Sequence, residues 1–267
     1  MLTVQNLVIE TTRKCNMKCQ HCLRGGSQRK SIPNEYTNKI LHLIDCVSNL
    51  TVGGGEVTLD MDALEYLAQC VLYNSCEVDS FYLVTNGKAI PVDKLAYWVS
   101  KMTFACTDNE MSHVAFSFDN YHTHTLTWNQ REKRERNYHN LQEVLDYEYG
   151  VCSGDGESIV IKHTDENSPM RLISEGRAKD FGYRPNTKEE LTEEQWGEDQ
   201  ISFTESELYL SCTGFLVAGC DWSYNSIDHR KDIRIAHIDD IHCQDDLIEA
   251  IRRYNKNFKE ARELVES

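Results

Sequence analysis

The sequence lacks both a long apolar run and a basic leader. No apolar stretch of membrane-spanning length occurs in the 267 residues, and Met1–Lys14 has neither a basic segment before an apolar one nor a small-residue cleavage site. A membrane-spanning helix requires a long apolar stretch, and a secretory signal requires a basic segment before an apolar one and a cleavage site. We therefore expect a protein that neither crosses a membrane nor is secreted, and that works in the cytoplasm.

Basic residues are also scarce. The chain has 28 Lys and Arg against 43 Asp and Glu, which gives a net charge of −15. Because Lys and Arg supply most phosphate affinity, this balance argues against a broad nucleic-acid-binding surface. The acidic excess is typical of a soluble surface, and it would also suit a cationic substrate.

Cysteine, in contrast, is abundant, with 11 residues. The number is odd, and a chain of this length without a secretory signal is a poor candidate for a disulfide scaffold. Cysteine in that setting more often serves metal binding or catalysis.

Short apolar runs alternate with amphipathic stretches through the first two-thirds of the chain, which predicts repeated strand–helix units. The right-handed crossover rule then gives a parallel sheet with helices outside. We expect an α/β fold, a partial (β/α)6 TIM-like barrel. The predicted strands are Leu7–Ile9, Leu50–Val52, Phe81–Val84, His113–Phe118 and Ser158–Lys162.

Helices are predicted from apolar residues that recur every three to four positions. Pro33 is expected to begin the first helix. Cys46 lies within the pattern of this helix and Cys70 within that of the next, and both are interpreted as core residues. The basic cluster at 131–136 alternates with glutamates and is interpreted as a solvated helix face. The predicted buried stripes are Tyr36, Ile40, Ile44 and Val47; Leu64, Leu67, Ala68 and Val71; Leu95, Trp98, Val99 and Met102; and Leu141, Val144 and Leu145.

The character of the sequence changes after about residue 182. Residues 184–200 are polar and acidic and are interpreted as a loop or lid. Residues 201–220 alternate like a β-hairpin with its turn at Thr213-Gly214, and a helix is expected from Asp245. We therefore divide the chain into a barrel core, 1–182, and an extension of acidic loop, hairpin and helix, 183–267.

Three cysteines, Cys15, Cys19 and Cys22, follow the first predicted strand directly. Three thiolates in one loop can hold three irons of a cubane cluster and leave the fourth iron open for a small-molecule chelate. A structural zinc completed by His21, or buried free cysteines, are the alternatives that the triplet alone leaves open.

The CxxxCxxC spacing resembles that of the radical S-adenosylmethionine (SAM) superfamily, and three further motifs follow in the order typical of that family. Gly54-Gly55-Glu56 ends the second strand, Thr85-Asn86-Gly87 ends the third, and Ser117-Phe118-Asp119 ends the fourth, with His122 close behind. Active sites of α/β barrels lie at this carboxyl end of the strands.

The resemblance implies a role for each motif. The three cysteines would ligate one 4Fe–4S cluster, whose open iron chelates SAM, and reductive cleavage would give a 5′-deoxyadenosyl radical that abstracts hydrogen from the substrate. Further residues would bind SAM: Gly54, Gly55 and Glu56 at its amino group, Thr85 and Asn86 nearby, and Ser117, Asp119 and His122 at its ribose.

The Gly176-Arg177-Ala178 segment resembles the one that precedes SPASM or twitch extensions in this superfamily. Arg177 would contact SAM or substrate, or lie on a helix surface. Such extensions often hold a second cluster, for which Cys212, Cys220 and Cys243 are just sufficient; because the CxxC of the full pattern is absent, we expect one cluster. Candidate substrate-contacting residues follow the hairpin: Cys220, Asp221 and Tyr224.

Several functions fit these motifs. The extension's resemblance favours an enzyme that modifies a peptide or protein side chain, supplied with electrons by a flavodoxin or ferredoxin. Chemistry on a nucleotide or other small molecule, and activation of a glycyl-radical partner, are the enzymatic alternatives. A non-catalytic iron–sulfur or zinc protein that senses redox state or binds a partner is the alternative from another class.

Overall fold

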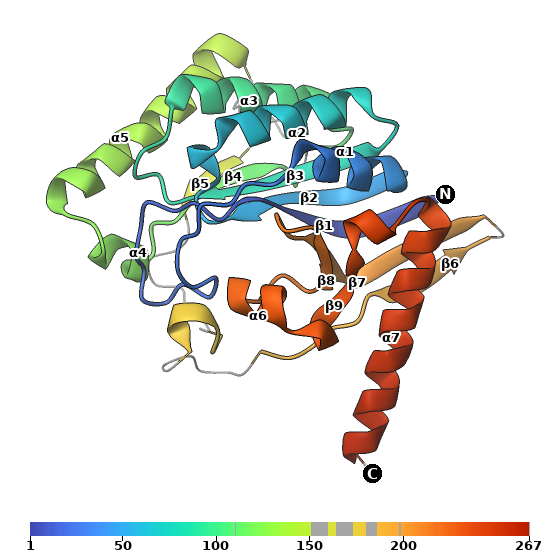
Figure 1. Ribbon diagram of the computed structural model, residues 1–267. Coiled ribbons are helices and arrows are strands. Elements are labelled where there is room, and N and C mark those ends of the chain that lie inside the picture. The colour runs from blue at the N-terminus through green and yellow to red at the C-terminus, as the bar shows by residue number, and fades with distance from the viewer. Residues whose placement is uncertain (110, 151–159, 164–172, 180–185, 198, 267) are drawn as a thin grey trace.

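The computed structural model describes residues 1–109, 111–150, 160–163, 173–179, 186–197 and 199–266. Within these ranges one nine-stranded sheet organises the chain (Figure 1). Its order is β5-β4-β3-β2-β1-β7-β8-β9, with β6 paired to β7. The strands are β1 (Leu2–Thr12), β2 (Cys46–Gly54), β3 (Glu77–Thr85), β4 (His113–Phe116), β5 (Val160–His163), β6 (Thr192–Trp196), β7 (Gln200–Leu210), β8 (Phe215–Ala218) and β9 (Arg234–His237).

The predicted parallel half-barrel is confirmed. Strands β1 to β5 pair in parallel, and β7 adds to the free edge of β1, also in parallel, so that six strands run in one direction. Carboxyl ends of parallel strands meet at one edge of a sheet. The loops that carry the sequence motifs are therefore gathered at that edge.

Helices α1, α2, α3 and α5 cover one face of this sheet, and α6 lies on the other side (Figure 1). The helices are α1 (Asn34–Leu43), α2 (Met61–Tyr73), α3 (Val92–Ala105), α4 (Asn120–His124), α5 (Trp128–Val144), α6 (Tyr224–His229) and α7 (Gln244–Glu266). No helix in the described ranges combines the length and apolar character that crossing a bilayer requires.

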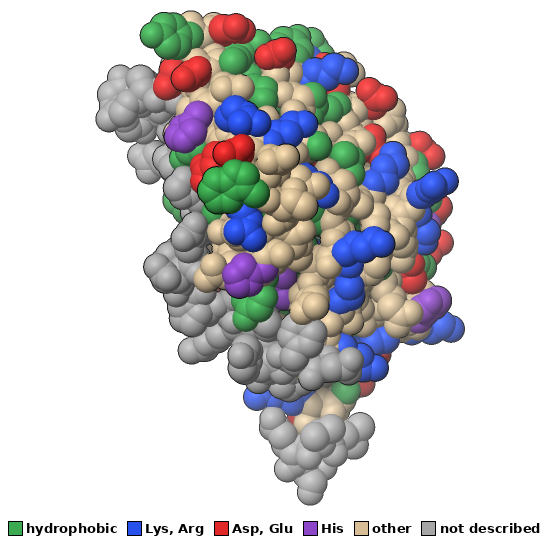
Figure 2. All heavy atoms as spheres, turned by 90° about the vertical axis from the view of Figure 1, so that its left-hand side faces the viewer, with side chains coloured by type: hydrophobic (Ala, Val, Ile, Leu, Met, Phe, Trp, Pro, Cys, Tyr) green, Lys and Arg blue, Asp and Glu red, His purple; other side chains and the backbone are tan. Residues whose placement is uncertain are grey.

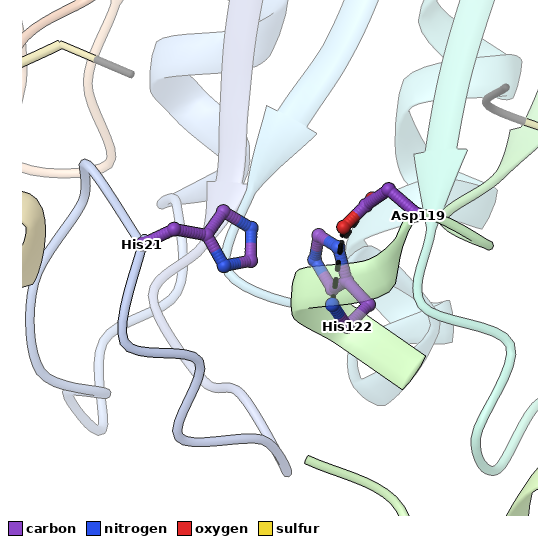
Figure 3. A group of neighbouring side chains, drawn as sticks. All are labelled: His21, Asp119 and His122. Atoms are coloured by element: carbon purple, nitrogen blue, oxygen red, sulfur yellow. Dashed lines mark hydrogen bonds and ion pairs between the residues drawn. The ribbon is translucent and has the colours of Figure 1, made fainter. Parts of the chain in front are cut away.

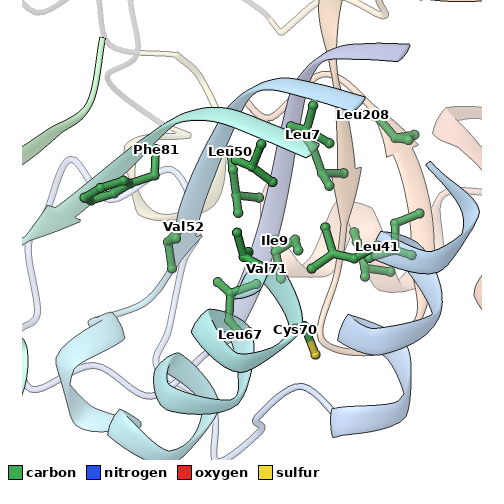
Figure 4. Close-up of a cluster of buried hydrophobic side chains, with 14 of the residues drawn as sticks. Leu7, Ile9, Leu41, Leu50, Val52, Leu67, Cys70, Val71, Phe81 and Leu208 are labelled. Atoms are coloured by element: carbon green, nitrogen blue, oxygen red, sulfur yellow. The ribbon is translucent and has the colours of Figure 1, made fainter. Parts of the chain in front are cut away.

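The main core forms where alternate strand residues meet the helices. Leu7 and Ile9 of β1 point to the same side as Leu50 and Val52 of β2, because side chains two apart share a face of a strand. They pack against residues of α1 and α2 (Figure 4). The intervening residue Val8 points to the other face and packs with a second cluster from the C-terminal part of the chain: Tyr209, Val217, Trp222, Ile227 and Ile233.

The apolar residues predicted to be buried on α2 and α3 are buried as expected, whereas the set predicted for α1 extends beyond the end of that helix. The helix stops at Leu43, and β2 begins at Cys46, so that Ile44 and Val47 are buried outside the helix. Cys46 is half-buried at the start of a strand rather than a helix core residue. An apolar run at this spacing fits either element, and pairing with β1 decides for the strand.

The interpretation of the α5 basic cluster as solvated holds for Lys133 and Arg136, which are exposed among acidic neighbours. Acidic and basic side chains intermix on the face turned toward the viewer in Figure 2. Arg134 is the exception, since it is only 2% exposed. Its Nη1 donates to the Ser117 carbonyl at 2.8 Å, and its guanidinium lies 4.2 Å from the Phe118 ring centroid.

The predicted hairpin is confirmed as β7 and β8, paired antiparallel with the turn at Gly214, whose φ is +85°. It continues the barrel sheet, because β7 pairs with β1. Thr192–Trp196, within the stretch expected to be an acidic loop, forms strand β6. The boundary placed after residue 182 lies outside the described residues, and the division into two domains stays a prediction.

Candidate active site

A cavity of about 420 Å³ opens at the carboxyl ends of the parallel strands, on the face opposite the main core. Val8, Thr51 and Tyr82, which point away from the helices, form part of its wall. The following predicted site residues line this central cavity: Cys15, Cys19, Cys22, Gly54, Gly55, Glu56, Thr85, Asn86, Ser117, Asp119, His122, Arg177, Cys220 and Tyr224. Asp221 is not among its lining residues; its carbonyl accepts a 2.6 Å hydrogen bond from Asn186 Nδ2.

The three cysteines of the loop after β1 surround one apolar spot. Cys19 packs with Met17 and Leu126, and the half-buried Cys15 and Cys22 pack against the same cluster. Burial raises the pKa of the Cys15 thiol to about 11, with the charges of Glu56, Cys22 and Cys19 adding to the shift. Three neighbouring soft donors in this setting suit a site with cationic iron.

The two glycines of the Gly54-Gly55-Glu56 motif let β2 approach the start of the cysteine loop. A Cβ on Gly54, whose φ is +138°, would lie 2.2 Å from the Thr12 carbonyl oxygen, and one on Gly55 would lie 2.3 Å from that of Lys14. Gly55 N and Glu56 N donate to those same two carbonyls at 2.7 Å each. Glycine is therefore required here for contact between two backbones, which the sequence alone did not indicate.

The Glu56 carboxylate joins the ends of β2 and β3. Its Oε1 accepts hydrogen bonds from the hydroxyls of Thr58 at 2.6 Å and Thr85 at 2.7 Å, and Oε2 accepts from Asn86 N at 2.7 Å. Glu56 is 1% exposed. A carboxylate offers about four acceptor positions, and Oε2 uses one of its two, so that a ligand donor can still be accepted.

The turn after β3 holds the cysteine loop from the other side. Asn86 Nδ2 donates to Asn16 Oδ1 at 3.0 Å, and Lys88 Nζ donates to the Asn16 carbonyl at 3.0 Å. The Thr85 hydroxyl donates to Glu56 and accepts from Gly87 N, so that it joins the turn after β3 to the end of β2. Asn16 and Lys88 were not identified from the sequence, because Asn16 is an unspecified position within the CxxxCxxC motif and Lys88 follows the Thr85-Asn86-Gly87 turn.

Asp119 and His122 form a pair at the end of β4 (Figure 3). Asp119 caps α4 by accepting from His122 N, and its Oδ2 lies 2.6 Å from His122 Nδ1. Burial lowers the pKa of His122, but hydrogen bonding to Asp119 and Cys19 outweighs it and raises the pKa to about 9. Burial raises the pKa of Asp119, and the bond to His122 overcomes this and lowers the pKa to about 2. The pair is therefore an ionic one.

His21 lies beside this pair. Its ring lies 4.5 Å from that of His122 and 4.9 Å from that of Tyr121, and ligand atoms of His21, Asp119 and His122 all lie within 4.8 Å of one another. Burial, followed by the charge of His122, lowers the pKa of His21 to about 4. The ring is thus neutral and stacked, a placement suited to packing against a planar ligand.

Arg177 reaches the central cavity from a 3-10 turn, Gly176–Ala178, that packs on the cysteine loop. Arg177 N donates to the Cys22 carbonyl at 2.9 Å, and a Cβ on Gly176 would lie 2.1 Å from the Leu23 carbonyl oxygen. Its buried Nε has no hydrogen-bond partner in the part of the chain that the structure describes. Of the two interpretations of Arg177, the cavity position is the one observed.

Cys220 and Tyr224 also line this cavity. Burial raises the pKa of Cys220 to about 12, so that it remains a thiol at neutral pH. The Tyr224 ring packs under the Arg13 guanidinium at 4.5 Å. The three candidates for a second cluster occupy different surroundings: Cys212 is in the main core, Cys220 lines the cavity, and Cys243 is exposed.

No family model matches the chain, and no curated protein matches it in sequence. The structure of native anSMEcpe with bound AdoMet and Cp18Cys peptide aligns over 95% of this chain and 82% of its own, at 14% identity and a TM-score of 0.54. This likeness confirms the partial-barrel fold. SuiB from Streptococcus suis is more distant. Its structure bound to S-adenosylmethionine aligns over 91% of this chain and 65% of its own, at 9% identity and a TM-score of 0.35. Its structure bound to precursor peptide SuiA aligns over 80% of this chain and 58% of its own, at 9% identity and a TM-score of 0.29.

Proposed function

We propose that this chain is a radical SAM enzyme that acts on a peptide. The observation that carries the proposal is the convergence on one cavity of the cysteine triplet, Gly54-Gly55-Glu56, Thr85-Asn86 and the Ser117 segment. The carboxyl ends of the parallel strands bring these four motifs to one edge of the sheet, and there they line a single cavity that could hold a shared ligand. The fold shared with anSMEcpe, which holds AdoMet and a peptide, supports the proposal.

The residues present fit a cubane cluster and SAM. Cys15, Cys19 and Cys22 supply three thiolates around an apolar spot, which leaves the fourth iron of a cubane open. The cavity of about 420 Å³ falls within the roughly 300–1,000 Å³ typical of small-ligand sites. When bound, this cluster supplies the electron that splits the SAM sulfonium into methionine and a 5′-deoxyadenosyl radical.

The chain's own residues would then bind and orient. The remaining acceptor position of Glu56 Oε2 suits the SAM ammonium, and the unpartnered Nε of Arg177 suits its carboxylate. The Ser117 hydroxyl, together with the ionic pair Asp119–His122, would contact the ribose. Gly54, Gly55, Thr85 and Asn86 act by fixing the loop.

Cys220, which lines the central cavity with Tyr224, would return a hydrogen atom from its S–H bond to a substrate radical. The electron donor, a flavodoxin or ferredoxin, the single cluster and the cytoplasmic location remain predictions from the sequence.

The test is anaerobic reconstitution with iron and sulfide, followed by an iron count and a dithionite-driven assay for 5′-deoxyadenosine. Wild-type protein should bind about four irons per chain, and the Cys15/Cys19/Cys22→Ala variant should bind none and release no deoxyadenosine. Cys46→Ala is the matched control, since this half-buried thiol does not line the cavity. It should load iron like wild-type.

The other functions are distinguished by the same preparation. Iron or zinc binding without SAM cleavage would establish the non-catalytic alternative and contradict the proposal. Four irons retained in the triple variant would place a second cluster at Cys212, Cys220 and Cys243. Deoxyadenosine release stimulated by nucleotides or a glycyl-radical protein, and not by peptides, would retain the radical chemistry and replace the substrate.

A further inference from the structure

Three arginines line the central cavity, and of these three only Arg13 forms ion pairs with carboxylates of the described residues. Arg13 is paired with Glu10 and Asp228. Arg24 and Arg177 form no ion pair with any described carboxylate, although the chain carries 43 acidic residues. A cation at a partly buried site without a counter-charge is costly, which points to an anion supplied by a ligand.

Arg24 is held rigidly by neutral groups. Its Nη1 donates to the Trp222 carbonyl at 2.8 Å, its guanidinium lies 4.8 Å from the Tyr209 ring centroid, and its own carbonyl accepts from Tyr224 N at 3.1 Å. None of these contacts offsets its charge. They fix the direction of the planar guanidinium, which is the property that recognition of a planar carboxylate requires.

Two phenol groups beside Arg24 also lack partners. The hydroxyls of Tyr209 and Tyr224 are buried and form no hydrogen bond within the described residues. Both tyrosines interact electrostatically with Arg24, and so does Cys220. A carboxylate can accept about four hydrogen bonds, so that one anion could be shared by the guanidinium and a phenol that reorients toward it.

The two arginines without an ion pair have different neighbours. Arg177 interacts with His21, one of the residues around the proposed SAM site. Arg24 interacts with Cys220 and Tyr224. If Arg177 takes the SAM carboxylate, Arg24 is left for a second anion.

A side hollow of about 510 Å³ leads to the same point from the protein surface. It shares Arg24, Gly25, Arg177 and Tyr224 with the central cavity, and its other lining residues are polar or glycine. Lys179 adds a third positive charge, and Glu175 adds a negative one whose Oε2 already accepts from Ser223 N and Ser226 Oγ. An extended chain lying in the side hollow could thus place one of its groups in the central cavity beside Arg24.

We propose that Arg24 anchors a carboxylate of the peptide substrate, held next to Cys220 and Tyr224 and entering through the side hollow. The carboxylate is that of an acidic side chain or of the peptide's C-terminus. The chain is acidic overall, but cations outnumber carboxylates in the lining of the side hollow, which favours a negative group there. Calling the ligand the substrate depends on the proposed function; the carboxylate site itself does not.

The test measures binding and needs no turnover. Dissociation constants of three probes are measured by ligand-observed NMR on the reconstituted protein with SAM: acetyl-Gly-Glu-Gly-amide, acetyl-Gly-Gln-Gly-amide and acetyl-Gly-Gln-Gly with a free C-terminus. At least one acid probe should bind about tenfold or more tightly than the neutral amide, the advantage expected of a charge-assisted hydrogen bond. The acid probe that binds more tightly than the neutral amide shows whether the carboxylate comes from a side chain or from the C-terminus.

Variants then locate the preference. Arg24→Gln should abolish it and Arg24→Lys should keep part of it. Arg234→Gln is the matched control, because Arg234 likewise donates to a carbonyl, that of Ile227, and lies over a ring, that of Phe215, but does not line the central cavity. It should leave the preference unchanged. Thermal unfolding of each variant checks that the fold is intact.

The proposal is overturned if neither acid probe binds more tightly than the amide, or if Arg24→Gln keeps the preference. Both results are independent of the proposed function. Deoxyadenosine release without a preference for an acid probe would support the radical chemistry and contradict the Arg24 carboxylate site. An Arg24-dependent preference without SAM cleavage would support the carboxylate site and contradict the radical chemistry.

Discussion

Replacing Arg13 by methionine should destabilise the apo protein by about 3–5 kcal/mol, the cost of leaving a buried charge unpaired. Arg13 Nε lies 2.5 Å from Glu10 Oε1, and both side chains are fully buried. After the substitution, the only remaining described hydrogen bond to the Glu10 carboxylate comes from Cys212 N, at 3.2 Å. Arg13 also bonds Asp228 of α6 at 2.6 Å, so that the change removes this contact and leaves Lys30, at 3.3 Å, as the ion-pair partner of Asp228.

Urea unfolding at neutral pH, followed by tryptophan fluorescence, measures this free energy. The double variant Glu10→Gln/Arg13→Met should regain at least about 1 kcal/mol relative to Arg13→Met, because no buried charge remains. Lys101→Met is the control: it breaks the more exposed pair with Glu65, and its cost should stay below about 1 kcal/mol. A single variant that costs no more than this control, or a double variant that regains nothing, would refute the reasoning.

Two further predictions concern the backbone contact and the pH dependence. Gly55→Ala should lower the unfolding free energy by about 1–3 kcal/mol and reduce iron loading, because the new Cβ would displace the Lys14 carbonyl and weaken two hydrogen bonds. Gly26→Ala is the control: Gly26 has open space around it, so this substitution should change neither the unfolding free energy nor iron loading. Burial raises the pKa of Asp228, but its bond to Arg13 prevails and lowers the pKa below 3.8. The stability from this pair is therefore complete above about pH 3.8 and lost as pH falls through the lower folded value, so that Asp228→Asn should flatten unfolding free energy against pH in that window.

The strand–helix order could be predicted because each element's apolar period is a local property. Leu64, Leu67 and Val71 on α2, or Leu95 and Trp98 on α3, mark a buried face whatever the remaining chain does. The end of α1 and the start of β2 could not be predicted, because the apolar spacing from Ile44 to Val47 fits a helix and a strand equally well. Pairing with β1 chose the strand.

The site was predictable as a set of residues and less so as a set of roles. Motif order gave the cysteine loop, Glu56 and Asp119, and the fold brings them to one cavity. Asp119 turned out to cap α4 and hold His122, and Gly55 to admit the Lys14 backbone rather than a ligand. Such roles depend on which groups are already hydrogen-bonded, and a sequence does not record that.

By itself the sequence determined the parallel half-barrel and the edge at which the chemistry would lie, because period and crossover handedness are carried by neighbouring residues. Only the tertiary structure decided which charges are compensated. Arg13, Arg24 and Arg134 are the same residue type, yet Arg13 is enclosed by two carboxylates, Arg24 lines the cavity without an ion pair to a described carboxylate, and Arg134 supports the β4 turn. Compensation of a charge requires partners from distant segments, and these meet only when the chain has folded.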